Sequence, residues 1–198
     1  LRRVRIIIAG QIMDGVKVFV ETDNDNAGKN GETAVSTDVQ DAWIDVRLAR
    51  FDMFGESEHW LQAGLILLPF SFENRSTAGA LLGLDYNAEA IKFVNTFVWR
   101  DQGVELHGNV GKRVAYRVGA FDGYDAPAAA AATFKKNDDA AVRVAGHVAV
   151  NLLGDAETGW FFTQDRQGKA GRYLSVGAGI DSQNKATIAT ATNSAGEY

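Results

Sequence analysis

The chain of 198 residues is 46% hydrophobic, has a formal net charge of −5 and contains no cysteine. The negative charge argues against nucleic-acid binding, and the lack of cysteine excludes disulfide bonds and thiolate chemistry. No run of about 18 apolar residues is present, which excludes a membrane-spanning helix. A β-barrel would escape this test, because only every second residue of its strands faces lipid.

The predicted elements are strands in which apolar and polar residues alternate. The first covers residues 3–12, where a valine and isoleucines alternate with Arg3 and Arg5. Successive side chains of a strand point to opposite faces, so this pattern predicts one apolar and one polar face. A turn at 13–15 leads to a second strand over 16–21. The same period predicts further strands over 41–49, 59–68, 103–110, 112–121, 141–152 and 172–181, and a weaker one over 186–192.

The connections between these strands alternate in length. Those after the first, third and fifth strands are short, whereas residues 22–37, 71–101 and 122–139 form long connections. Residues 80–93 and the alanine run within 122–139 are compatible with helical turns, and Trp160–Phe162 is not assigned. Short turns on one side and long loops on the other are typical of outer-membrane barrels.

The strand lengths favour a membrane protein. Tilted membrane-crossing strands need about 9–11 residues, whereas strands of the competing soluble β-sandwich average about 5–6. The predicted fold is therefore all-β, an antiparallel transmembrane β-barrel. Residues 1–198 are interpreted as a single β-barrel domain, incomplete at both ends, with about eight or nine strands of a larger barrel. No signal peptide is recognised at the N-terminus.

In such a barrel the polar face lines the lumen, and its charged residues are the predicted channel-lining set. Rings of basic residues favour anions in a pore, so a basic surplus on this face predicts a modest anion preference. The alternative is that charges of both signs pair across neighbouring strands. The predicted lining residues are Arg3, Arg5, Lys17, Glu21, Asp45, Arg47, Glu105, His107, Arg113, Arg117, Arg143 and His147, with Asp181 as a further acidic member.

Other chemistry is not indicated. His107 and His147 share the predicted lumen face without the three or four converging ligands of a metal site. The acidic run Glu21–Gly28 fails the pattern of a twelve-residue calcium loop, because position twelve, counted from Asp23, is Ala34 rather than glutamate. No catalytic motif is found, so no enzyme activity, cofactor or metal is predicted. Most of seven aromatic residues lie near strand ends, a placement that suits interfacial girdles, although Trp43 and Trp60 could face inward. The seven are Trp43, Trp60, Phe70, Trp99, Tyr116, Tyr124 and Trp160.

Four segments, in matching order, resemble motifs of the phosphate-selective porin family of Gram-negative outer membranes. They are Arg2–Ile6 followed by Ala9 and Gly10, Ala63–Glu73, Arg100–Gly108 and Tyr116–Gly123. The resemblance implies a barrel of about sixteen strands, commonly a homotrimer, that passes small solutes. It also implies contact with membrane lipid and lipopolysaccharide. By analogy with porins, residues 71–101 could fold into the lumen. No lysine-rich segment matches a phosphate-collecting site, so phosphate selectivity does not carry over.

These inferences predict an outer-membrane porin for passive diffusion of small polar solutes or ions, with a preference for anions. The alternative is a non-conducting structural or binding barrel of the outer membrane that anchors or sheathes a partner. A soluble β-sandwich binding module is a third reading.

Overall fold

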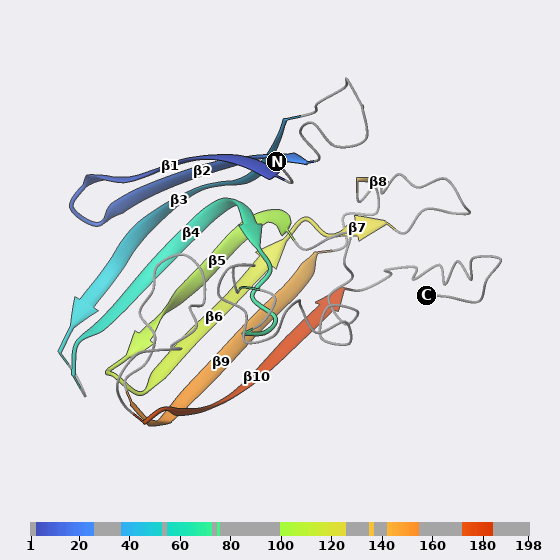
Figure 1. Cartoon of the computed structure of the whole chain (residues 1–198). Helices are drawn as coiled ribbons and strands as arrows, with labels where there is room; N and C mark the ends of the chain where they lie inside the picture. The colour runs from blue at the N-terminus through green and yellow to red at the C-terminus, as the bar shows by residue number, and fades with distance from the viewer. Residues whose placement is uncertain are drawn as a thin grey trace.

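The computed structural model describes residues 3–25, 37–52, 55–72, 75, 100–125, 135–136, 142–154 and 172–183. Eight strands form one antiparallel sheet in the order β1-β2-β3-β4-β5-β6-β9-β10, which Figure 1 shows as a curved, open surface. The strands of this sheet are β1 (Arg3–Met13), β2 (Val16–Asp25), β3 (Asp38–Phe51), β4 (Ser57–Leu67), β5 (Arg100–Val110), β6 (Val114–Phe121), β9 (Arg143–Leu153) and β10 (Leu174–Gln183).

Most predicted strands are confirmed, with shifted ends. The second strand continues to Asp25 and the third begins at Asp38, so the connection between them is shorter than predicted. Within the third long connection, β7 (Tyr124–Asp125) pairs with β8 (Lys135–Lys136). The alanine run between these two short strands lies outside the described residues. The proposed strand at 186–192, the helical turns at 80–93 and residues 160–162 lie outside the described residues.

The strand register places the two kinds of side chain on opposite faces of the sheet. Antiparallel partners share a face, and the pairs Trp43↔Gly64, Gly64↔Gly103 and Gly103↔Phe121 define one row of the polar face. The pairs Val46↔Leu61, Leu61↔Leu106 and Leu106↔Val118 define a row of the apolar face. The two-residue period predicted from the sequence therefore runs through the whole sheet.

The apolar face is bare over the described strands. Ile8 is 68% exposed and Ile180 is 62% exposed, although both are large hydrocarbon side chains. A β-sandwich would bury these residues against a second sheet. Their exposure is therefore incompatible with a β-sandwich. An apolar band facing outward is what a strand in lipid needs. Within the described residues, no helix is long and apolar enough to cross a membrane.

The opposite face holds a small aromatic core. Phe19 and Trp43 stack with ring centroids 5.3 Å apart, and both are buried. A Cβ added to Gly103 would lie 2.5 Å from the Phe121 ring, so the glycine makes room for the aromatic side chain on the next strand. Such glycine–aromatic pairs fix the register of curved sheets. The cluster contains Phe19, Trp43, Ile66, Leu68, Phe121 and Ala145.

Strands β1 and β10 form the two edges of this sheet and do not pair with each other. The described strands thus form an open section of wall rather than a closed barrel. At the β1–β2 turn, Gly15 has a φ of 74°, a conformation that glycine adopts at little cost.

Candidate functional site

The structure places nearly all of the predicted lining residues on the face that carries the aromatic core. Arg113 is the exception, since it lies exposed in the turn before β6 and donates to the Leu152 carbonyl at 3.1 Å. The side chain of Arg3 lies outside the described part of the chain. The face that they share is called the polar face below.

Near the β1 edge, the cation of Arg5 joins two carboxylates of β2. Its guanidinium lies 2.8 Å from Glu21 Oε1 and 3.1 Å from Asp23 Oδ2. Gln40 of β3 donates to the same Asp23 oxygen at 2.8 Å. Glu21 and Asp23 are both buried, so these hydrogen bonds offset the loss of hydration of their charges.

The centre of the polar face is a second network of hydrogen-bonded and charged side chains. His107 Nε2 of β5 lies 3.0 Å from Asp45 Oδ1 of β3, with β4 between the two strands. On the neighbouring strand Arg117 pairs with Glu105, which is fully buried. Charges that pair across strands help to hold neighbouring strands in register.

At the β10 edge, Arg143 and Asp181 form a two-pronged ion pair. Arg143 Nε donates to Asp181 Oδ1 at 2.8 Å, and its Nη2 contacts the other carboxylate oxygen. A bidentate geometry matches the planar guanidinium to the carboxylate. The pair joins β9 to β10 with both side chains largely buried.

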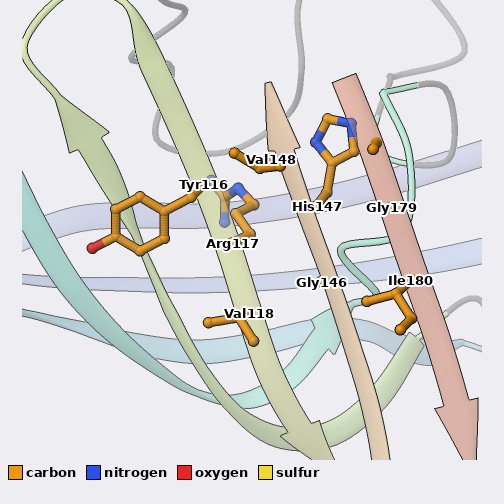
Figure 2. Close-up of a pocket in the computed structure, with 9 residues that line it drawn as sticks. Tyr116, Arg117, Val118, Gly146, His147, Val148, Gly179 and Ile180 are labelled. Carbon is orange, nitrogen blue, oxygen red and sulfur yellow. The ribbon is translucent and has the colours of Figure 1, made fainter. Parts of the chain in front are cut away.

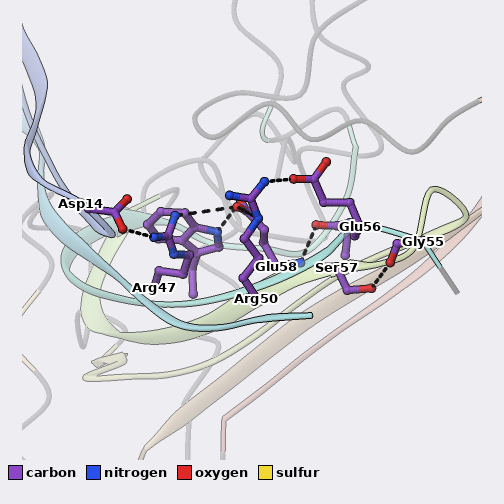
Figure 3. Close-up of polar contacts among 9 residues, drawn as sticks. Asp14, Arg47, Arg50, Gly55, Glu56, Ser57 and Glu58 are labelled. Carbon is purple, nitrogen blue, oxygen red and sulfur yellow. Dashed lines mark hydrogen bonds and ion pairs between the residues drawn. The ribbon is translucent and has the colours of Figure 1, made fainter. Parts of the chain in front are cut away.

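A fourth group of contacts lies where short turns join the strands (Figure 3). Arg47 Nη2 lies 2.6 Å from Asp14, and Arg50 Nε lies 3.5 Å from Glu58. Trp60 donates to Glu58 through its indole nitrogen at 3.3 Å. The paired charges here are more exposed than those at the centre.

Two cations also lie over the ring of Trp60. Lys17 Nζ is 3.7 Å from the ring centroid and the Arg47 guanidinium carbon is 5.6 Å from it. Cation–π attraction holds charges at such distances. Trp43 and Trp60 both face inward and are buried, which confirms the alternative raised for them by the sequence.

The aromatic girdle prediction is only partly met. At the short-turn end, the ring of Tyr116 lies 5.8 Å from His59, on which Phe51 stacks. Phe70, by contrast, packs against the core cluster of the polar face. The sequence predicts Phe70 in the girdle because it follows a strand end, but the chain turns inward there. The side chains of Trp99, Tyr124 and Trp160 lie outside the described part of the chain.

Sequence reasoning missed six charged residues that belong to the polar face. The two-residue period could have found Asp23 and Asp41, since they extend the strands of Glu21 and Asp45. Arg100 was missed because β5 begins earlier than predicted; its Nη2 lies 2.9 Å from Asp41. With these residues included, carboxylates and cations are about equally common, so the predicted basic surplus is not observed in the described wall. The missed residues are Asp23, Asp41, Glu58, Arg75, Arg100 and Asp101.

The chain leaving β4 folds back over the polar face. Residues 68–72 together with Arg75 are called the inward segment here. Leu68 is fully buried in the aromatic cluster and Arg75 is 5% exposed. Figure 1 draws this segment in front of the sheet, and Figure 2 shows it beside β10. The inward path predicted for residues 71–101 therefore holds for the described beginning of that connection.

Arg75 carries a charge into this covered region. Its Nη1 donates to the Leu67 carbonyl at 2.9 Å and lies 3.8 Å from Glu105 Oε2. Burial, and secondly the charge of Arg117, lower the pKa of the Arg75 guanidinium to about 9. The side chain therefore remains a cation at neutral pH.

A shallow hollow of about 390 Å³ is lined by residues of β6, β9 and β10 (Figure 2). Gly146 leaves room between the larger side chains of Val118 and Ile180. Its walls are mostly apolar and offer no set of polar groups for chemistry. No group of three potential metal ligands occurs among the described residues.

Comparison with known proteins supports one family. A family model for phosphate-selective porin O and P matches residues 1–194. Searches of curated proteins and of solved structures gave no significant match. The match covers almost the whole chain and confirms the resemblance seen in four sequence segments. The chain therefore belongs to the phosphate-selective porin O and P family, which comprises non-enzymatic β-barrel channels of the Gram-negative outer membrane.

Proposed function

We propose that the protein forms a water-filled channel through which small polar solutes and ions diffuse passively. The observation that supports this most strongly is the inverted distribution of side chains. Charged residues gather on one face of the sheet, and the opposite face exposes valine and isoleucine. In a membrane barrel the first face meets water in the lumen and the second meets lipid.

The anion preference stays a prediction, and we expect it to be small. Described cations of the polar face such as Arg5, Arg117 and Arg143 each lie against a carboxylate. Paired charges cancel most of the field that a ring of arginines would create. Selectivity then depends on the local excess of one sign at the narrowest point.

Planar bilayer recordings of the whole purified protein test the channel. We expect discrete, long-lived open steps with an ohmic current. A protein that inserts but stays silent would instead be the non-conducting barrel that anchors or sheathes a partner. Insertion is checked separately by flotation with lipid vesicles, so that silence is not mistaken for failure to insert.

Reversal potentials in a potassium chloride gradient test the ion preference. Lys17→Gln with Arg47→Gln removes the two cations over Trp60, and we expect the reversal potential to move toward cation selectivity. Lys112→Gln is the matched control, because Lys112 lies in the exposed turn between β5 and β6. Cation selectivity of the unmodified protein would refute the anion preference.

We further propose that the wall is part of one β-barrel domain of about sixteen strands, in contact with lipid and lipopolysaccharide. Open edges such as β1 and β10 leave backbone groups without partners in lipid, where each costs several kcal/mol. A homotrimer is the expected assembly. Native mass spectrometry in detergent tests it, since a single mass of one chain would exclude the trimer.

A further inference from the structure

We propose that Arg75 is a positioning residue that fastens the inward segment across the polar face, with Glu105 as its anchor and Gly179 as the seat for the backbone. The consequence of this arrangement is a narrower pore, and that part of the inference rests on the proposed channel function. Its structural part stands on three contacts that link β4, β5 and β10.

The first contact is the one made by Arg75. Its guanidinium is held between the Leu67 carbonyl at 2.9 Å and Glu105 Oε2 at 3.8 Å. Both Arg75 and Glu105 are buried, so neither charge can be left alone without a large loss of hydration energy. The pair therefore ties a residue on the connecting chain to the middle of β5.

The second contact is hydrophobic. Leu68 is fully buried and belongs to the cluster with Phe19, Trp43 and Phe121. Phe70 packs against the same cluster. The segment is thus pressed onto the polar face near β4 by apolar packing, and it carries on toward β10.

The third contact is the seat at Gly179. A Cβ at this position would lie 1.7 Å from the Phe70 carbonyl oxygen, far closer than two such atoms can approach. The backbone of the inward segment can therefore reach β10 only because residue 179 has no side chain. At Gly177, on the same strand and face, a Cβ would lie 2.8 Å from Nε2 of the His147 ring and 3.2 Å from the Val148 carbonyl oxygen, without the severe backbone overlap found at Gly179. That ring is the far end of a side chain that can rotate away.

The three contacts make a clamp that holds the segment where solutes would pass. Glu105 also forms an ion pair with Arg117. The group of Arg75, Glu105 and Arg117 therefore bears one excess positive charge. Loss of the clamp would free the segment and widen the path. Loss of a charge alone would change ion preference without widening it.

Conductance and reversal potential separate these two effects. Arg75→Gln and Glu105→Gln change the local charge in opposite directions, but both break the clamp. We expect single-channel conductance to rise in both variants, while their reversal potentials shift in opposite directions. Arg75→Lys keeps the charge and should stay closer to the unmodified conductance. Opposite changes in conductance would show that Arg75 acts only through its charge, and would overturn the proposal.

Cleavage by trypsin tests the clamp without any conduction. Arg75 is 5% exposed, so the folded protein in detergent should resist cleavage after this residue. Gly179→Ala should speed that cleavage, as should Glu105→Gln, whereas the matched Gly177→Ala should not. Mass spectrometry of the fragments locates the cut. Equal cleavage in Gly179→Ala and Gly177→Ala would refute the seat.

Conductance and trypsin cleavage together distinguish failure of the clamp from failure of the channel function. A silent unmodified protein with the expected cleavage pattern would refute the channel and retain the clamp. Open channels with unchanged conductance and cleavage in all variants would refute the clamp and retain the channel. If Gly179→Ala does not fold, judged by its migration before and after boiling, Glu105→Gln decides the matter through cleavage.

Discussion

The two faces of the same strands obey opposite rules. On one face Ile8 is 68% exposed, and on the other Glu105 is fully buried although it carries a charge. A water-soluble protein would reverse both placements. The outer face of this sheet is therefore built to meet lipid, and the charged side chains of the other face are satisfied by one another.

The largest effect is expected on the apolar face. Val118 lies within β6 and is 46% exposed, so Val118→Arg would place a charge in lipid. We expect a loss of about 2–4 kcal/mol in the free energy of unfolding, measured by urea titration in lipid vesicles. Val110→Arg, at the end of β5 beside the turn, should cost only about 0–1 kcal/mol because the side chain reaches the interface. Equal costs would contradict the lipid-facing assignment.

A smaller loss is expected where the polar face needs a glycine. A Cβ at Gly64 would lie 2.1 Å from the Ala42 carbonyl oxygen, and its φ is 136°. Gly64→Ala should therefore destabilise the protein by about 1–3 kcal/mol. At Gly10 nothing lies within 4 Å of the added Cβ, so Gly10→Ala should change stability by less than about 0.5 kcal/mol. If the order of these two variants were reversed, the packing of the polar face would be wrong.

The buried ion pair between β9 and β10 should give a moderate coupling. Arg143→Met, Asp181→Asn and the double variant form a cycle around a pair whose side chains are 3% and 11% exposed. We expect a coupling energy of about 1 kcal/mol, which persists at high salt because the pair is shielded from solvent. A coupling indistinguishable from zero would mean that the pair is too hydrated to link the strands.

The smallest effect is expected at the short-turn end. Asp14 lies 2.6 Å from Arg47 but is 84% exposed. Because exposed pairs contribute little, Asp14→Asn should change the free energy of unfolding by less than about 0.5 kcal/mol. Glu21→Gln removes a buried partner of Arg5 at a similar distance and should cost more. A larger cost for Asp14→Asn would show that distance, rather than burial, sets the strength of these pairs.

The strands and their two faces could be predicted from the sequence because the two-residue period is a local property of the pleated backbone. Trp43, Asp45 and Arg47 share a face whatever lies around them. The strand ends were less certain, and Arg100 was assigned to a loop for that reason. The same period, followed further, would have added Asp23 and Asp41 to the polar face.

Pairing of charges could be proposed but not located from the sequence. Whether Glu105 meets Arg117 depends on the register between β5 and β6, which local pattern does not fix. As a result the sequence suggested a surplus of basic residues, while the folded wall brings most described charges into pairs.

The alternation of residues along the chain was enough to predict a sheet with a lipid face and a polar face, and four segments carried the motifs of the family. The inward turn of the chain after β4, with Arg75 on Glu105 and the Phe70 backbone against Gly179, became visible only in the folded structure. These residues are far apart along the chain, so their contact follows from the curvature of the sheet and the path of a connection. Neither leaves a periodic mark in the sequence.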